Sequence, residues 1–187
     1  MKSIYLLIGL FIITTASCKS SRSTASQAEI DALQTMVTNK QFRIESDWVY
    51  PQVTNAMQQV LSSGLLQPGS AGGGINLIGN ANFLRVSGDS ITSYLPYYGE
   101  RQMQVAYGGG DSAIEFKGLL KDYQAVQNSD HSYTVSFEAK SNSENFNVYI
   151  RLSPNLNSYM TVNGTSRHTI RYSGEVKPIK SAKKDKS

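Results

Sequence analysis

Residues 132–164 read SYTVSFEAKSNSENFNVYIRLSPNLNSYMTVNG, and this stretch decides the predicted fold. Its first part alternates apolar and polar side chains, which is the period of a strand with one buried face. The apolar members are Tyr133, Val135, Phe137 and Ala139. The segment 146–152 alternates in the same way, although Tyr149 adds an aromatic side chain to the opposite face. Short turns rich in Asn and Ser separate these segments, so they predict consecutive antiparallel strands.

Further apolar runs extend the pattern in both directions. On the N-terminal side, two runs flank Ser87-Gly88-Asp89 and predict a hairpin, because Gly and Asp accept the backbone angles of a tight turn. On the C-terminal side, the last run ends near Val176. Strands that recur about every 8–12 residues are typical of an antiparallel sheet. We therefore predict an α+β protein that is mainly β: an antiparallel meander that curls into a sandwich or partial barrel, with one N-terminal helix packed on it.

The predicted helix begins at Ser26, which can form a capping box with Glu29. Apolar residues then recur at helical spacing and predict about four turns with one apolar side. They are Ile30, Leu33, Met36 or Val37, and Phe42.

From residue 42 the apolar period changes from helical to alternating. The run 42–50 is typical of a strand that slips by one residue at Asp47 and ends at Pro51. Residues 52–61 return to helical spacing and predict a short second helix. The glycine-rich segment 64–74 that follows predicts a flexible loop.

The N-terminus has the features of a secretory signal peptide. Lys2 precedes an apolar run of ten residues, 4–13, which is too short for a bilayer because a spanning helix needs about 20 residues. Residues 1–17 are therefore expected to be the signal peptide. Cys18 follows directly and is the single cysteine of the chain, which excludes a disulfide within the chain.

Residues 15–18, TASC, resemble a bacterial lipobox. The resemblance implies that Cys18 carries acyl chains once the signal is removed, and that residues 18–25 form the lipid anchor and a polar tether. By the same analogy, Lys19 favours the outer membrane, and the lack of an acidic run after Cys18 favours its periplasmic face. The predicted location is therefore an outer-membrane lipoprotein facing the periplasm, held to the membrane through the acyl chains on Cys18.

Positive charge is concentrated at the C-terminus. The chain has a formal net charge of +4, and residues 177–187 contain five lysines against one aspartate. Residues 18–176 are close to neutral, so the basic pI gives no support for nucleic-acid binding. We interpret residues 177–187 as a basic flexible tail, with contact to anionic lipid or cell-wall polymer as the alternative. Residues 26–176 are then a single β-rich domain with its N-terminal helix.

Three motifs are distinctive: GDSITSYLPYYG at 88–99, YGGG at 107–110 and FKG at 116–118. Behind a lipobox and one helix, this combination resembles a family of small lipoproteins from Bacteroidota that is known only as a domain of unknown function. The resemblance covers the whole mature chain and implies a β-rich fold and an envelope location. It implies no reaction and no ligand.

The first two motifs contain the candidate ligand or partner surface. Its residues are Tyr94, Tyr97, Tyr98, Tyr107, Gly108, Gly109 and Gly110. In a strand, Tyr94 and Tyr98 would face one way and Tyr97 the other. An aromatic platform beside a glycine loop can hold a sugar or an anion. The alternative, which we favour, is a sheet corner where the tyrosines pack their rings and Pro96 marks an edge strand or a bulge.

Catalytic and metal-binding patterns are scarce. His131 and His168 each lie apart from cysteine or patterned carboxylates, and no nucleophile, metalloprotease or nucleotide-binding motif occurs. We therefore predict no enzymatic activity, no metal and no cofactor.

Two Asp-Ser-apolar sequences resemble acceptors for O-glycosylation in exported Bacteroidota proteins, at Ser90 and Ser112. Ordinary turn chemistry is the alternative explanation for both.

The leading hypothesis is a non-catalytic envelope lipoprotein whose domain is a periplasm-facing binding or structural module for an envelope protein, a glycan or a lipid. The first alternative is a carrier of a small apolar or sugar ligand in a partly closed β-barrel. The second is a hydrolase whose carboxylates meet in space, drawn from Asp89, Asp111, Glu115 and Glu138. A roomy apolar cavity would favour the carrier, two close buried acids would favour the hydrolase, and neither would favour a binding surface.

Overall fold

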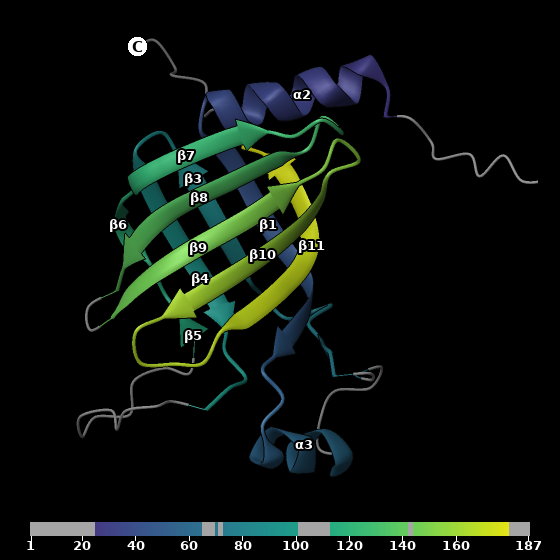
Figure 1. Ribbon diagram of the computed structural model, residues 1–187, viewed down its shortest axis with the longest axis vertical. Coiled ribbons are helices and arrows are strands. Elements are labelled where there is room, and N and C mark those ends of the chain that lie inside the picture. Colours follow the sequence, from purple (N-terminus) through teal and green to yellow (C-terminus); the bar gives the residue numbers. More distant parts are fainter. Residues whose placement is uncertain (1–24, 65–69, 71–72, 101–112, 142–143, 180–187) are drawn as a thin grey trace, which may run out of the picture.

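Eleven strands in the described part of the chain form one antiparallel sheet (Figure 1). The computed structural model describes residues 25–64, 70, 73–100, 113–141 and 144–179. The helices are α2 (Gln27–Thr38) and α3 (Asn55–Ser62). The strands are β1 (Gln41–Pro51), β2 (Ile75–Asn76), β3 (Phe83–Ser87), β4 (Ser90–Pro96), β5 (Ala113–Ile114), β6 (Lys117–Leu119), β7 (Lys121–Gln127), β8 (Tyr133–Lys140), β9 (Asn145–Leu152), β10 (Asn157–Gly164) and β11 (Ile170–Pro178).

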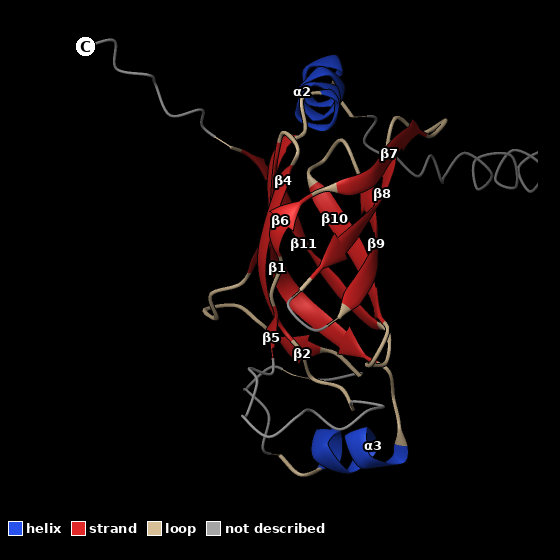
Figure 2. Ribbon diagram, turned by 90° about the vertical axis from the view of Figure 1, so that its left-hand side faces the viewer, coloured by secondary structure: helices blue, strands red, loops and turns tan. Residues whose placement is uncertain are grey.

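The strand order is β5-β4-β3-β1-β11-β10-β9-β8-β7, with β2 paired to β1 and β6 paired to β4. The predicted meander is confirmed from β7 to β11. The first long strand, β1, lies between β11 and β3, so the two ends of the domain pair over a long register from Phe42↔Pro178 to Pro51↔Ile170. Among the described residues no pairing joins β7 to β5 or β6. The sheet therefore curls strongly without closing into a barrel (Figure 2).

Large side chains fill the inside of the curled sheet. The alternating residues of β8 and β9 that the sequence assigns to one face are all buried there. The largest fully buried side chains are Tyr172, Phe42, Phe116 and Phe146. The rings of Phe116 and Phe146 meet edge to face, with their centroids 5.0 Å apart. Burying aromatic rings of this size is among the largest favourable contributions to folding.

Helix α2 covers one end of the curled sheet, and α3 lies beyond the other end (Figures 1 and 2). The predicted capping box is confirmed: the Glu29 N–H donates to Ser26 Oγ at 3.3 Å, and the Ser26 N–H donates to Glu29 Oε2 at 2.8 Å. The predicted apolar stripe is buried at Ile30, Leu33, Met36 and Val37.

The helix is shorter than predicted. It ends at Thr38 with Asn39 as its C-cap, and Lys40 then has a positive φ of 52°. This left-handed residue turns the chain, so Phe42 begins the alternation of β1 and is not part of the helical stripe.

The predicted slip at Asp47 is confirmed as a register shift between Ser46 and Trp48 against β11. The side chain of Asn82 satisfies the backbone there, accepting from the Ser46 N–H and donating to the Ser46 carbonyl, both at 2.8 Å. On the partner strand, a Cβ at Gly174 would collide with the carbonyl oxygen of Glu45 and would lie 2.5 Å from Ser46 Cα. The close approach of β1 and β11 at this bulge therefore requires glycine.

The predicted second helix is present as α3, whose N-cap Thr54 accepts from the Met57 N–H at 3.1 Å.

Strand β11 continues through Pro178, two residues beyond the predicted domain boundary. Lys177 is held there by Glu45, with 2.8 Å between Nζ and Oε2. No described helix is both long and apolar enough to cross a membrane.

Candidate functional site

The three described tyrosines of the predicted surface lie around the end of β4. Tyr94 lies in β4 and is 42% exposed, whereas Tyr97 follows the end of the strand and is 7% exposed, as the predicted alternation requires for these two. Tyr98 is partly buried and packs against the core, so the predicted strand alternation does not extend to it. All three line a surface hollow of about 360 Å³. Its lining is Asn80, Ala81, Tyr94, Pro96, Tyr97, Tyr98 and Ala113.

Tyr97 is held in place by backbone groups. Its hydroxyl donates to the carbonyl of Glu100 at 2.8 Å and also lies 3.2 Å from the carbonyl of His168. Gly99 leaves room for this arrangement, because a Cβ there would lie 2.5 Å from the Tyr97 hydroxyl oxygen. Through these contacts Tyr97 links the end of β4 to the backbone at Glu100 and His168, which is a structural role.

The prediction that Pro96 marks an edge strand or a bulge is wrong. Strand β4 pairs with β3 on one side and with β5 and β6 on the other, and Pro96 is its last residue, opposite Ala113. At this end position the missing N–H of proline disrupts little of the ladder. The Pro96 carbonyl accepts from the hydroxyl of Tyr172 at 2.9 Å, and burial raises the pKa of that hydroxyl above its usual range.

Several predicted site residues lie outside the described part of the chain. They are Tyr107, Gly108, Gly109, Gly110, Ser112 and the lipidation residue Cys18. The juxtaposition of the tyrosines with the glycine loop therefore stays a prediction.

A buried ion pair lies beside Tyr97. Arg167 Nε and Glu144 Oε2 are 2.8 Å apart, and the two side chains are only 7% and 2% exposed. The other carboxylate oxygen of Glu144 accepts from the Ser166 N–H at 2.9 Å. The Arg167 guanidinium lies 5.0 Å from the ring centroid of Tyr97 and 5.6 Å from that of Phe146. The pair is thus enclosed by aromatic rings and hydrogen-bonded on both carboxylate oxygens.

The sequence interpretation missed this pair because both members belong to polar turn segments, where charged residues are usually solvated. One signal is visible only in three dimensions. A Cβ at Gly164 would collide with Glu144 Oε1, so the glycine of that turn makes room for the carboxylate.

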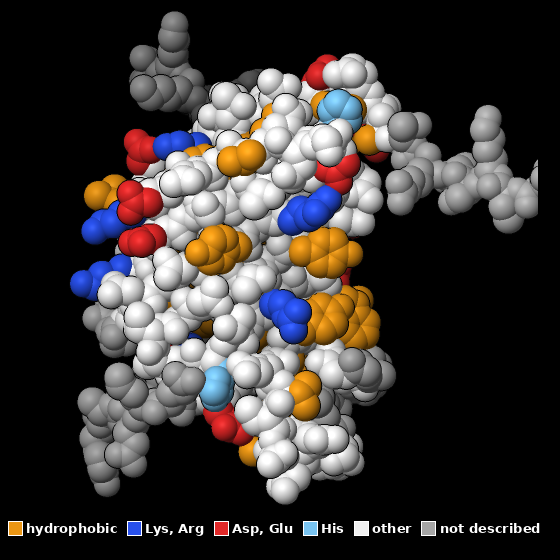
Figure 3. All heavy atoms as spheres, viewed as in Figure 1, with side chains coloured by type: hydrophobic (Ala, Val, Ile, Leu, Met, Phe, Trp, Pro, Cys, Tyr) orange, Lys and Arg blue, Asp and Glu red, His pale blue; other side chains and the backbone are white. Residues whose placement is uncertain are grey.

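A second aromatic surface lies on the outer face of β1, β11, β10 and β9. The register aligns two rows across these strands. One row is Tyr50, Arg171, Thr161 and Tyr149, and the other is Trp48, Ser173, Tyr159 and Arg151. Tyr50, Tyr149 and Tyr159 are 37%, 50% and 59% exposed. Aromatic and basic side chains lie beside one another on this face (Figure 3), which we call the Tyr-Arg face.

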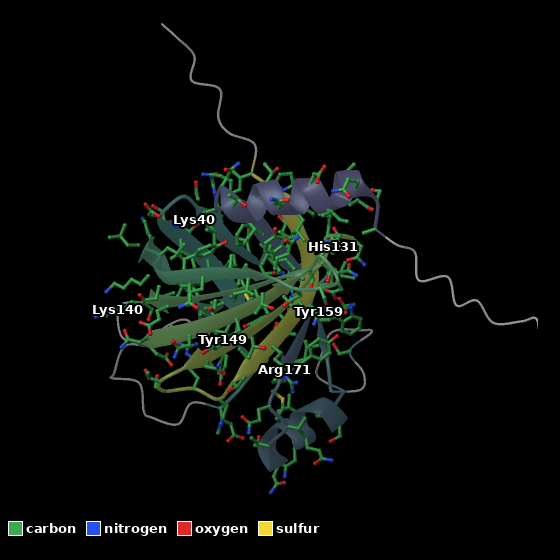
Figure 4. The ribbon with its side chains drawn as sticks, turned by 45° about the horizontal axis from the view of Figure 1, so that its top comes forward. Lys40, His131, Lys140, Tyr149, Tyr159 and Arg171 are labelled. Atoms are coloured by element: carbon green, nitrogen blue, oxygen red, sulfur yellow. The ribbon has the colours of Figure 1, made fainter. Side chains whose placement is uncertain are left out.

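The Tyr-Arg face contains a groove. A hollow of about 300 Å³ lies between Tyr50 and Tyr159, and a second of about 560 Å³ extends towards Pro51, Gln52 and Val53. Thr161 and Arg171 line both hollows. Figure 4 shows Tyr149, Tyr159 and Arg171 projecting from the outer face of neighbouring strands.

The two arginines of this face differ in their partners. Arg151 Nη2 lies 2.6 Å from Asp130 Oδ2. The Ser132 hydroxyl and N–H, with Arg151, lower the pKa of Asp130 to about 2, so this carboxylate is ionised at neutral pH. In the described part of the chain, no carboxylate lies within 4.0 Å of Arg171.

The other predicted residues are dispersed. Ser90 is exposed at the β3–β4 hairpin, where Gly88 has a φ of 60°, and its glycosylation stays a prediction. His131 lies in the β7–β8 turn and His168 precedes β11. The described residues contain no group of three or more His, Cys, Asp or Glu that could hold a metal ion. Glu115 and Glu138 are exposed, so neither belongs to a buried acidic cluster.

Comparisons with known proteins support the fold. A family model described as a domain of unknown function, DUF4251, matches residues 24–176. A solved structure of a DUF4251 family protein from Bacteroides eggerthii DSM 20697 is similar with a TM-score of 0.55 and 16% sequence identity. The alignment covers 82% of this chain and 90% of that chain. The curated proteins contain no match. At this identity the structural likeness supports the fold alone.

Proposed function

The chain belongs to the DUF4251 family, a domain of unknown function, and we propose that it is a non-catalytic envelope lipoprotein that binds its partner through the Tyr-Arg face. The family membership confirms the resemblance inferred from the sequence motifs. The binding function rests on one observation: three exposed tyrosines and two arginines lie on four adjacent strands of one sheet. Tyr and Arg are enriched where proteins bind their partners.

The distribution of side chains favours a surface over an interior site. Large aromatic residues occupy the inside of the curled sheet, so a carrier with a roomy internal cavity has less support. Glu144 is the one buried acid among the described residues, and it is paired with Arg167. A hydrolase that needs two close buried acids therefore also has less support.

The anchor is part of the same proposal. We infer from the signal-like N-terminus and the lipobox-like residues 15–18 that Cys18 is acylated and holds the domain at the periplasmic face of the outer membrane. The seven residues 19–25 can span at most about 25 Å before α2 begins. Because α2 covers one end of the sheet and the groove extends towards Pro51 at the other end, this orientation keeps the groove away from the membrane (Figure 2).

Site-specific photo-crosslinking in growing cells tests the binding function. A benzophenone side chain would replace Tyr159 or Tyr149 in the full-length lipoprotein, with Arg85 on the outer face of β3 as the exposed control position. Benzophenone reacts with C–H bonds, so it captures protein, glycan and lipid partners alike. We expect adducts at Tyr159 and Tyr149 and few at Arg85. Equal adducts at all three positions, or none, would contradict the proposal.

A further inference from the structure

We propose that the groove around Arg171 binds a saccharide that carries a carboxylate group. Arg171 holds the carboxylate, and Tyr50 and Tyr159 lie against the faces of the sugar rings. This inference rests on the proposed binding function and deepens it by naming the ligand class and the residues that select it.

The groove is lined by one cation and two aromatic rings. Arg171 is paired in register with Tyr50 on one side and with Thr161 on the other, while Tyr159 is paired with Ser173 two residues along β11. Tyr50 and Tyr159 therefore flank β11, on backbones that lie about 10 Å apart across it. Both rings and Arg171 line the same hollow.

The charge of Arg171 is available to a ligand. The arginines at 43, 151 and 167 each contact a carboxylate within 2.8 Å. No described carboxylate lies within 4.0 Å of Arg171. A guanidinium presents its N–H donors as a planar fork that matches the two oxygens of a carboxylate. An acidic group in the ligand therefore complements the guanidinium of Arg171. A neutral group would leave this guanidinium without a charged partner.

The aromatic walls of the groove are supported from behind. A Cβ at Gly74 would lie 2.9 Å from Tyr50 Cε1 and 3.4 Å from Trp48 Cε3, so this backbone packs directly against both rings. The Tyr50 hydroxyl also lies 3.4 Å from Ser173 Oγ. A ring that is held before binding loses less conformational entropy when the ligand arrives.

The polar lining suits a ligand with many hydroxyl groups. Thr161 and Thr169 line the groove beside Arg171, and Thr169 Oγ1 donates to Asn163 Oδ1 at 2.7 Å. Hydroxyl side chains both donate and accept, as sugar hydroxyls do. Aromatic faces beside convergent polar groups are the usual composition of small-ligand sites.

The size of the groove favours a saccharide over a folded protein. The two hollows, of about 300 and 560 Å³, fall in the range of small-ligand sites, about 300–1,000 Å³. A specific protein interface buries about 800 Å² on each partner, preferably between complementary shapes. The outer face of a strongly curled sheet is convex and offers a partner protein a narrow area of contact (Figure 2).

The test measures binding of defined oligosaccharides to the purified full-length protein by calorimetry. The probes are short oligomers of galacturonate, glucuronate and mannuronate, each compared with its methyl ester, which keeps the sugar skeleton and removes the charge. We expect at least one uronate to bind, with at least tenfold weaker binding of its ester. The Arg171→Gln variant should weaken binding of the acid at least tenfold. The Arg85→Gln variant makes the same change of charge on another exposed arginine of the outer face and should stay within twofold.

The rings are tested by Tyr159→Ala and Tyr50→Leu, each expected to weaken binding at least fivefold, with unchanged circular dichroism as the folding control. Failure of all three uronates to bind would overturn the inference. So would equal affinity for an acid and its ester, or equal losses in Arg171→Gln and Arg85→Gln. A protein adduct captured at Tyr159 in cells, with no uronate binding, would refute the ligand class and leave the proposed binding function standing.

Discussion

Replacing Arg167 by methionine removes one half of the buried ion pair and leaves Glu144 in a site where its side chain is 2% exposed. The carboxylate would keep the hydrogen bond from the Ser166 N–H and lose the guanidinium. Breaking a buried pair in this way costs about 3–5 kcal/mol, because a charge stays buried without its partner. For a domain of about 150 residues this corresponds to a fall in Tm of roughly 6–20 °C.

The double variant Arg167→Met with Glu144→Gln separates the charge from the packing. Methionine can fill the space beside the rings of Tyr97 and Phe146, and the amide that replaces the Glu144 carboxylate carries no charge. We therefore expect the double variant to recover about 1–3 kcal/mol relative to Arg167→Met alone. The assay is urea unfolding followed by the fluorescence of Trp48, the single tryptophan of the chain.

The free energy of unfolding decides the outcome. If Arg167→Met lowers the free energy of unfolding by less than about 1 kcal/mol, the pair contributes no more than an exposed salt bridge does. That result would refute the expectation that burial makes the loss of one partner costly. A double variant less stable than Arg167→Met would show that Glu144 contributes mainly by its shape and hydrogen bonds, without a penalty for the unpaired charge.

Three further predictions follow from other parts of the molecule. Gly174→Ala should destabilise the domain by about 1–3 kcal/mol or more in urea unfolding, because the added Cβ would meet the backbone of Glu45. The control is Gly118→Ala, whose Cβ would have nothing within 4 Å, and its free energy of unfolding should change by no more than about 0.5 kcal/mol. The pKa of Asp130, followed by NMR, should be about 2 and should rise towards 3.8 in Ser132→Ala. Because folding depresses this pKa, its stabilising effect is complete above about pH 4 and is lost as the pH falls through about 2; a midpoint near 3.8 in the unaltered protein would be contrary evidence. Intact mass spectrometry should find a product that begins at Cys18 with acyl chains, absent in Cys18→Ser; an unacylated product cut elsewhere would exclude the anchor.

Features that depend on neighbouring residues could be predicted from the sequence. The capping box at Ser26, the hairpin turn at Gly88 and the slip at Asp47 each follow from a few adjacent side chains, and all three are present. The buried faces of β8 and β9 follow from strict alternation over eight residues each. Such patterns are reliable because the period of a strand or helix is a property of the local backbone.

The misjudged features depend on contacts at a distance. Pro96 is typical of an edge strand, yet pairing with residues 113–114 makes β4 an internal strand. Glu144 and Arg167 both lie in polar turns, and only the fold brings them together away from water. Apolar periodicity carries no information about such pairings.

The amino-acid order alone was enough to establish a mainly antiparallel protein, its N-terminal helix, its turns and its family. It could not establish that β1 lies between β11 and β3, because strand pairing over more than a hundred residues depends on the packing of the whole core. The Tyr-Arg face is a result of that pairing. Tyr50 of β1 and Tyr159 of β10 lie on either side of β11, which carries Arg171, only in the folded sheet. The sequence therefore gives the identity of each residue of the candidate site, but only the tertiary structure brings these residues together.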